Sequence, residues 1–536
     1  MQQSARANPP LEVVVLHFVA ATLSGIFLIL SFPQFHLGFL AWISLVPLLL
    51  SCRNTSPRRA FLFGWITGII AFSGIVYWIV IAMHQHGNIP FLPSVLILLL
   101  FATYLGLFVG IFSTLMSFFL QYFPRPSILV LVAPSVWVSL EILRTHLFTG
   151  FPWALLGYSQ YQWLSIIQIA DITGVYGVSF LIVLINTFLA LLIPTLTIRF
   201  RERLKVRIGP MAFPAVITTT LVLLTLFYGQ FKLESLHRAP DQRDIHLGLI
   251  QANINQEEKW DPSFRQKTID HYRNLTIQTI KNHGADGVDL IVWPEASTPF
   301  NFALENTFRD QITTLVQTQQ TPLLFGSIAV KEITEESAQL LNRAYLLSSQ
   351  GTILNHYDKM HLVPFGEYAP QFLSFTNKLA HGIGDYVPGN EHTIMSGPHG
   401  RFGVAICFEV IYPDLVRRFV KDGAEYMITI TNDAWYDSSS APYQHFSMVV
   451  FRAVENRVSF ARAANTGISG FIDVDGSIKR TTKLFEQAAI VDTVTLGHDQ
   501  TVYTAYGNVF AYLCVGFTLG LILFAFGRQK RHYEES

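Results

Sequence analysis

The sequence contains few cysteines, with three in 536 residues. Cys52 and Cys514 fall in or beside long apolar stretches, so Cys407 is the only cysteine in the long polar part of the chain. Without a partner for Cys407, a fold stabilised by disulfides is not expected. A lone thiol in such a region is either a small buried hydrophobic residue or a reactive group.

The sequence also lacks an internal repeat, a glycine-rich phosphate-binding loop, a low-complexity tract and a basic patch of the kind that binds nucleic acid. Its 37 lysines and arginines are balanced by 37 aspartates and glutamates. No nucleic-acid partner is therefore expected. The balance of charge says little else, because the chain consists of two unlike parts.

Long apolar stretches dominate residues 1–232, and another lies at 506–527. A helix needs about 20 mostly apolar residues to cross the hydrocarbon core of a bilayer. We expect about seven transmembrane helices in residues 1–232 and one more at 506–527. The candidate spans, of which the second is short, are 11–31, 36–50, 60–82, 91–120, 126–143, 164–194, 211–231 and 506–527.

The arginines and lysines between these spans are unequally distributed. If the N-terminus is cytoplasmic, the short cytoplasmic segments hold nearly all of them, and the short loops on the other side hold only Arg144. Cytoplasmic loops of membrane proteins are enriched in basic residues. This pattern predicts cytoplasmic termini and places residues 244–496 on the far side of the membrane.

Residues 244–496 have short apolar runs separated by polar turns. Strand-like runs at 246–250 and 289–293 flank a helical pattern at about 262–284, and further strand-like runs follow. Alternating strands and helices are typical of a layered α/β fold, and about 250 residues are enough for one such domain.

Three residues suited to acyl transfer each follow a strand-like run. They are Glu295, Lys359 and Cys407. A thiol becomes nucleophilic as the thiolate, so we expect Lys359 and a helix beginning near Glu409 to lower the pKa of Cys407. Glu295 can take the thiol proton, Lys359 can stabilise the oxyanion, and Glu367 can orient that lysine. Taken singly, the acid and the lysine could equally be surface ion pairs.

The sequences around these residues resemble a known family. The motifs are W-P-E at 293–295, D-K-x-H-L-V-P-F-G-E-Y at 358–368 and C-F-E at 407–409. They are similar to the Glu-Lys-Cys signatures of the nitrilase superfamily and, with the flanking spans, to its membrane-embedded branch, the apolipoprotein N-acyltransferases. The resemblance implies a nitrilase-like αββα sandwich on the periplasmic face of a Gram-negative inner membrane.

The resemblance also implies a reaction, the last step of lipoprotein maturation. A fatty acyl chain would pass from a phospholipid, typically the sn-1 chain of phosphatidylethanolamine, to a cysteine thioester. It would then pass to the amine of the S-diacylglyceryl cysteine of an apolipoprotein. No cofactor or metal is implied, and we expect a monomer.

The resemblance implies the following roles: Glu295 as general base, Lys359 as the group that stabilises the intermediate, Cys407 as nucleophile, Glu367 as supporting acid, and Glu409 and Trp260 as residues tied to the active site or substrate. Phe408 is placed by the resemblance among the substrate-binding residues, although many members of the family have tyrosine there. Trp435 follows a strand-like run, so it could either line an acyl groove or pack structurally.

Two other functions remain open at this point. A membrane-anchored amidase or nitrilase-type hydrolase would use the same three residues and pass the acyl group to water. A non-enzymatic lipid-binding or transport protein would keep the bundle but would not need the thiol. A membrane tether favours a lipid substrate, because a soluble substrate gives no reason for eight spans. A glycine-bearing apolar loop at 365–389 could dip into the bilayer, act as a lid or simply pack onto the domain.

Overall fold

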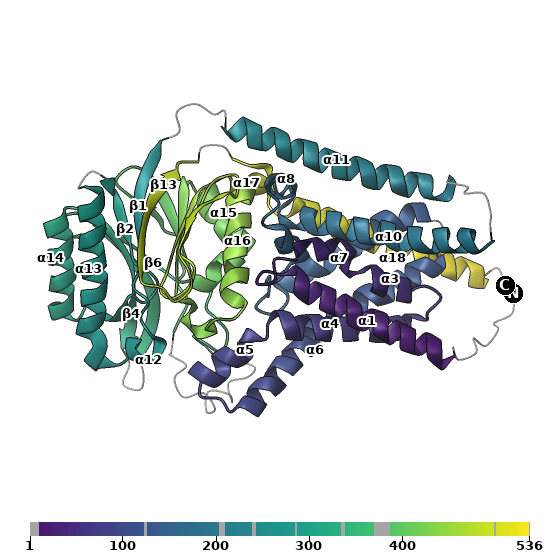
Figure 1. Cartoon of the computed structure of the whole chain (residues 1–536), viewed down its shortest axis with the longest axis horizontal. Helices are drawn as coiled ribbons and strands as arrows, with labels where there is room; N and C mark the ends of the chain where they lie inside the picture. Colours follow the sequence, from purple (N-terminus) through teal and green to yellow (C-terminus); the bar gives the residue numbers. More distant parts are fainter. Residues whose placement is uncertain are drawn as a thin grey trace.

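The protein is described by a computed structural model that covers residues 10–122, 126–202, 209–237, 243–284, 287–333, 338–368, 386–497 and 500–534. A helical bundle forms one end of the molecule and an α/β domain forms the other (Figure 1). Most of the predicted lid loop falls outside the described residues.

Within the described residues, six helices of the bundle are long and apolar enough to cross a membrane. Helix α4 (Pro57–Ile75) passes the same test only together with the segment after it, formed by α5 (Trp78–Ile81) and η2 (Ala82–His86), which is bent from it by 51°; counted as one span, this pair would be the seventh. The six are α1 (Leu11–Ser31), α6 (Phe91–Tyr122), α7 (Pro126–His146), α10 (Val175–Glu202), α11 (Gly209–His237) and α18 (Val509–Glu534). With the short segment described next, the arrangement agrees with the expected bundle of about eight helices.

Two predicted spans differ in detail from the structure. The segment Gly38–Ser51, formed by η1 (Gly38–Leu40), α2 (Ala41–Ser44) and α3 (Val46–Ser51), is apolar but shorter than a full crossing. The predicted span 164–194 is divided into α8 (Leu164–Ile167), α9 (Ala170–Thr173) and the start of α10. The break occurs at Gly174, whose φ is +64° and where a Cβ atom would lie 2.7 Å from the Tyr503 ring.

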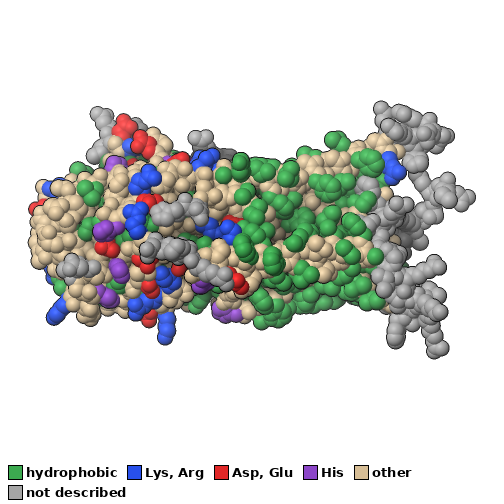
Figure 2. Space-filling model, turned by 90° about the horizontal axis from the view of Figure 1, so that it is seen from above, with side chains coloured by type: hydrophobic (Ala, Val, Ile, Leu, Met, Phe, Trp, Pro, Cys, Tyr) green, Lys and Arg blue, Asp and Glu red, His purple; other side chains and the backbone are tan. Residues whose placement is uncertain are grey.

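The surface of the bundle is apolar where lipid would surround it. Hydrophobic side chains form a broad band over the bundle, whereas charged side chains gather over the α/β domain (Figure 2). The start of α1 and the end of α18 both lie at the end of the bundle away from that domain (Figure 1). The domain is therefore held by α11 before it and α18 after it.

The α/β domain contains two sheets. The seven-stranded sheet has the order β13-β1-β2-β4-β5-β6, with β3 paired to β4, and the six-stranded sheet has the order β12-β11-β10-β9-β8-β7. The strands of the first are β1 (Asp244–Gln251), β2 (Leu290–Val292), β3 (Thr298–Asn301), β4 (Leu323–Ile333), β5 (Ala338–Leu347), β6 (Ile353–Asp358) and β13 (Ala488–Thr495). Those of the second are β7 (Ile394–Ser396), β8 (Arg401–Ile406), β9 (Tyr426–Thr431), β10 (Phe460–Ala464), β11 (Gly470–Ile472) and β12 (Ile478–Thr481).

Helices cover both outer faces of this pair of sheets. Helices α13 (Arg265–His283) and α14 (Asn306–Gln319) lie outside the seven-stranded sheet, and α15 (Pro413–Lys421) and α16 (Ala441–Asn456) lie between the six-stranded sheet and the bundle (Figure 1). The parallel strands β8, β9 and β10 are almost fully buried, as expected for strands covered on both faces. The domain is the predicted αββα sandwich.

Candidate active site

The three predicted catalytic side chains all lie just beyond the ends of strands. Glu295 follows β2, Lys359 follows β6 and Cys407 follows β8 directly. Two of these strands belong to the seven-stranded sheet and the third to the six-stranded sheet. The backbone N–H of Asn432, directly after β9 of the six-stranded sheet, donates to Glu295 Oε2 at 2.9 Å, and the carboxylate of Glu409, two residues after Cys407, accepts from the backbone N–H of Met360, directly after Lys359, at 2.7 Å. The two sheets therefore contribute to one site.

Lys359 joins two carboxylates in a buried cluster. Its Nζ atom lies 3.3 Å from Glu295 Oε1 and 2.9 Å from Glu367 Oε1. Asn342 on β5 donates hydrogen bonds to the same two oxygens, at 2.8 and 2.9 Å. The backbone N–H of Val363 donates to the other oxygen of Glu367 at 2.7 Å. Glu367 therefore orients both Lys359 and the loop that follows it.

The cluster keeps both Glu295 and Lys359 charged. Burial raises the pKa of Glu295, but Lys359, Asn342 and Lys259 outweigh it, so the net pKa is lowered. Burial lowers the pKa of Lys359, but Glu367 and Glu295 outweigh it and raise that pKa well above its usual value. At neutral pH the site thus contains a carboxylate ready to accept a proton beside a fixed ammonium.

A second lysine, which sequence analysis did not single out, also lies beside the base. Lys259 ends the short helix α12 (Gln256–Lys259), is almost completely buried and donates a hydrogen bond from Nζ to the Glu295 carbonyl oxygen at 3.0 Å. Burial lowers its pKa to about 8. Its place in the polar run Q-E-E-K gave no signal, because such a run usually lies on a solvated surface.

Cys407 lies in a tight turn between β8 and the 3₁₀ helix η7 (Cys407–Ile411). Its φ of +53° is in the left-handed region, which is uncommon for a residue with a side chain. Burial and the charge of Glu295 raise the pKa of the thiol, and Lys359 opposes them only in part. The expected lowering of this pKa is therefore wrong. The helix that follows the thiol is only five residues long, and burial outweighs the cation.

Glu409 connects the nucleophile turn with the lysine loop. Its Oε1 atom accepts hydrogen bonds from Tyr357 Oη and the backbone N–H groups of Met360 and His361, and its Oε2 atom accepts from Ile406 N, all within 2.7–3.1 Å. The side chain is fully buried, and burial raises its pKa to about 7. Glu409 was predicted to be tied to the active site or substrate, and the hydrogen bonds of its carboxylate place it between the loop after Lys359 and the turn of Cys407.

Aromatic residues occupy the space between the nucleophile and the bundle. Phe408 is stacked against Trp153 at 6.5 Å between ring centroids, and Trp153 contacts Trp78 and Tyr436 at 4.7 and 6.4 Å. Trp435 packs edge-on against His86 of η2 at 5.7 Å. These contacts form a continuous apolar wall from the membrane helices to the site.

Trp260 lies at the end of α12 and is 41% exposed. Its ring is therefore accessible from outside the domain, whereas the neighbouring Lys259 is buried beside Glu295.

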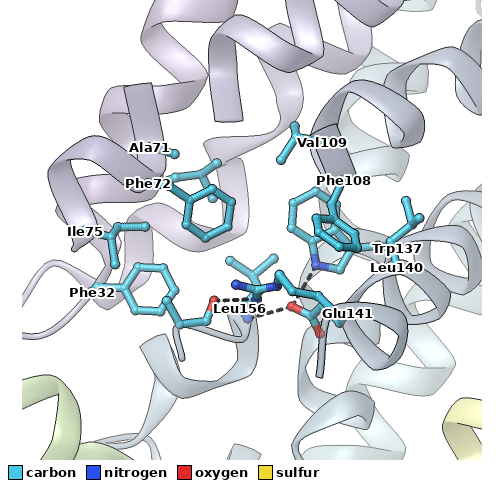
Figure 3. A pocket seen from close by; sticks show the side chains of 13 residues that line it. Phe32, Ala71, Phe72, Ile75, Phe108, Val109, Trp137, Leu140, Glu141 and Leu156 are labelled. Carbon is cyan, nitrogen blue, oxygen red and sulfur yellow. Dashed lines mark hydrogen bonds between the residues drawn. The ribbon is translucent and has the colours of Figure 1, made fainter. Parts of the chain in front are cut away.

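Two charged residues of α7 brace the loop that carries Trp153. Arg144 donates hydrogen bonds to the carbonyl oxygens of Trp153 and Ala154 at 3.0 and 3.2 Å. Glu141 Oε1 accepts from Leu156 N at 2.8 Å and from Trp137 Nε1 at 2.9 Å, beside the apolar side chains of a pocket in the bundle (Figure 3). Glu141 and Arg144 therefore fix a loop beside the active site through its backbone.

Comparison with known proteins agrees with this architecture. Residues 24–188 match the family model of the apolipoprotein N-acyltransferase N-terminal domain, and residues 246–501 match that of carbon-nitrogen hydrolase. The chain is 42% identical over 522 residues to an apolipoprotein N-acyltransferase of Geobacter metallireducens, covering 96% of each chain. The chain belongs to the apolipoprotein N-acyltransferase family.

Other relatives extend this similarity. An apolipoprotein N-acyltransferase of Pasteurella multocida is 30% identical, covering 95% of each chain. An amidase of the nitrilase superfamily from Nesterenkonia is a solved structure that aligns with 48% of this chain and 93% of its own, at 18% identity and a TM-score of 0.37. As a member of the apolipoprotein N-acyltransferase family, the protein is a membrane-embedded acyltransferase of lipoprotein biosynthesis.

Proposed function

We propose that this acyltransferase moves a fatty acyl chain from a phospholipid, typically the sn-1 chain of phosphatidylethanolamine, to the amine of an S-diacylglyceryl cysteine at the start of an apolipoprotein. The acyl chain is carried as a thioester on Cys407. The observation that carries the proposal is the buried cluster of Glu295, Lys359 and Glu367, which Glu409 joins by hydrogen bonds to the turn that carries Cys407.

The first half-reaction forms the thioester. The lowered pKa of Glu295 and the raised pKa of Cys407 keep a carboxylate and a neutral thiol at rest. The thiol proton therefore passes to Glu295 as sulfur attacks the ester carbonyl, and Lys359 stabilises the resulting oxyanion. When the tetrahedral intermediate collapses, the ester C–O bond breaks. The departing glycerol oxygen takes the proton from Glu295, and lysophospholipid leaves.

The second half-reaction transfers the chain to the acceptor. The lipoprotein amine attacks the thioester carbonyl and gives its proton to Glu295, with Lys359 again beside the oxyanion. The C–S bond then breaks, the new amide is released, and the sulfur recovers its proton from Glu295. The two halves share one base and need no further reactant, so the scheme is a ping-pong mechanism.

A lipid donor is supported by the apolar wall that joins the site to the bundle. Trp78 and Trp153 come from the membrane part, and Phe408 and Tyr436 come from the α/β domain. These side chains are nearly completely buried, so the membrane part excludes water from the side of the domain that carries Cys407. An acyl chain that enters from this side stays in apolar surroundings, whereas a small water-soluble amide gains nothing from them. The enzyme works as a monomer in a bacterial inner membrane, with the α/β domain in the periplasm and both termini in the cytoplasm.

Intact-mass analysis tests the proposal. Purified protein incubated with phosphatidylethanolamine should gain one fatty acyl chain, and it should lose that chain when a diacylated lipopeptide is added. Cys407→Ser should show no gain, whereas Cys514→Ser, which changes a buried cysteine of the bundle, should react like the wild type. Release of free fatty acid without triacylated peptide would support the hydrolase instead, and an unmodified wild-type mass would contradict the scheme.

A further inference from the structure

We propose that His445 is a positioning residue that holds the backbone of Cys407 in its reactive conformation and is itself held by Trp153 of the membrane bundle. The inference rests on the proposed thioester function of Cys407. It assigns a role to a cluster of buried polar residues that the acyl-transfer scheme does not use.

The contact to the nucleophile is made by the histidine ring. His445 on α16 is fully buried, and its Nε2 atom lies 3.1 Å from the carbonyl oxygen of Cys407. Because a carbonyl oxygen only accepts hydrogen bonds, Nε2 must carry a hydrogen. Cys407 has left-handed backbone angles, which are unfavourable for a residue with a Cβ atom. A fixed donor on its carbonyl oxygen favours this conformation over others.

The opposite edge of the ring is fixed by a buried ion pair. Arg462 Nη2 lies 2.8 Å from Asp433 Oδ2 and 3.0 Å from His445 Nδ1, and Asp433 Oδ1 is 3.2 Å from the same nitrogen. Burial and Arg462 lower the pKa of His445, so the ring is neutral and Nδ1 accepts from Arg462. This bond selects the tautomer with the hydrogen on Nε2, which is the one that the Cys407 carbonyl requires.

The same ion pair reaches the side chain of the nucleophile. Thr431 Oγ1 donates to Asp433 Oδ1 at 3.0 Å, and the Thr431 side chain offsets part of the rise in the pKa of the Cys407 thiol. His445 thus contacts the Cys407 carbonyl directly, and Asp433 holds both His445 and Thr431. A change in the cluster moves the sulfur relative to Glu295.

Trp153 of the membrane bundle packs against one face of the His445 ring. Trp153 is stacked on His445 with 5.6 Å between ring centroids and 28° between planes. The indole N–H of Trp153 donates to Oε1 of Gln444, the residue before His445, at 2.7 Å. The loop of Trp153 is in turn fixed by Arg144. The bundle therefore contributes to the geometry of the nucleophile as well as to lipid access.

Two substitutions of His445 separate positioning from folding. His445→Gln keeps a side-chain N–H that can reach the Cys407 carbonyl, and His445→Phe keeps the ring and its stacking but removes the donor. We expect thioester formation to slow by about 100-fold in His445→Phe, because displacement of a reacting atom by about 1 Å has an effect of that size. The glutamine variant should recover to within about fivefold of the wild type. The KM for phospholipid should not change in either variant.

The measurement is the rate of the mass gain on Cys407 in full-length protein in detergent, with the thermal unfolding midpoint recorded for each variant. Thioester formation at the wild-type rate in His445→Phe would overturn the inference, as would equal slowing in both variants at unchanged unfolding midpoints. If His445→Phe does not fold, His445→Gln is compared with Asp433→Asn, which changes the ion pair that holds the ring. Equal slowing of thioester formation in these two variants would also overturn the inference. Alkylation of Cys407 by iodoacetamide gives a second readout that needs no lipid, so failure of the proposed donor is distinguishable from failure of this inference.

Discussion

The two sheets of the α/β domain contribute different things to one site. The seven-stranded sheet provides the ionised groups that act on protons and oxyanions, namely Glu295, Lys359 and Glu367. The six-stranded sheet provides a neutral thiol whose place is set by backbone geometry and by fully buried polar contacts. Activation and positioning are therefore separated in space. Glu409, which accepts hydrogen bonds from both sides, is the link between them.

The largest expected effect comes from removing the base on the charged side. Glu295→Gln has nearly the same shape but cannot accept the thiol proton, so thioester formation should fall by about 1,000-fold. The protein is incubated with phosphatidylethanolamine, the reaction is quenched at successive times, and the intact mass of each sample gives the rate of thioester formation. Glu258→Gln, which changes an exposed glutamate paired with Lys267, is the matched control and should retain the wild-type rate. A loss of less than tenfold in Glu295→Gln would show that Glu295 does not act as the general base.

Removing the cation should have a somewhat smaller effect. Lys359→Met deletes the ammonium that lies between Glu295 and Glu367, and we expect a loss of about 100-fold in thioester formation because one oxyanion-stabilising group is gone. The acidic cluster should then also bind a proton more readily, since its cation is missing. Lys267→Met, a surface change, is the control. An equal rate in Lys359→Met and Lys267→Met would contradict the assigned role.

The role of Glu409 as the link between the sheets should be visible in the pH dependence of thioester formation. The carboxylate of Glu409 accepts four hydrogen bonds, and its pKa is about 7, above the usual value for glutamate. As pH falls through 7, the carboxylate of Glu409 is protonated and its Oε2 atom no longer accepts the hydrogen bond from Ile406 N–H. The rate of thioester formation should therefore fall on the acid side of pH 7. Glu409→Gln should be slower by about 30-fold at pH 8 and should lack this change near pH 7.

The comparison that decides this point is the pH profile of the variant. Glutamine places an NH₂ group against Ile406 N–H at every pH, so the fall near pH 7 should be absent from its profile, which leaves only the titration of Lys259 near pH 8. A variant that keeps the same fall near pH 7 would show that another group titrates there and that Glu409 is not the link.

The smallest effect is expected at Phe408. The residue is buried against Trp153 and Tyr412. Phe408→Tyr keeps the ring and its stacking on Trp153, so the rate of thioester formation should change by less than about threefold. Phe408→Ala opens a cavity beside the nucleophile and should lower both that rate and the thermal unfolding midpoint. Equal behaviour of the two variants would show that the ring does not support the turn.

The chain sequence predicted the two-part architecture and the three residues at strand ends. Long apolar runs indicate membrane helices and short ones indicate buried strands, so the length of each run distinguished the two kinds of element. A residue that directly follows a buried strand lies at the edge of its sheet, and this position identified the three site residues. Strand β12, whose residues are all exposed, was missed because an exposed strand has no apolar pattern. Strands β10 and β13 were also missed: β10 contains the arginine of F-A-R-A-A, and β13 mixes buried and half-buried positions without strict alternation.

The supporting residues of the site could not be found in the same way. Asn342 lies within a strand, Lys259 in a polar run and His445 in a helix, and none has a local pattern that separates it from structural residues. Each acquires its contact through pairing between distant segments. The direction of the Cys407 pKa shift was also wrong, because a sequence shows which charges are present but not how deeply the thiol is buried.

The attachment of the α/β domain by α11 on one side and α18 on the other has a kinetic consequence. A catalytic domain anchored to the bilayer at both ends meets its proposed lipid substrates by lateral diffusion. Its rate therefore depends on the number of substrate molecules per unit of membrane area. Diluting the donor with inert lipid should slow turnover even when the amount of donor in the tube is constant, whereas diluting the vesicles in buffer should not.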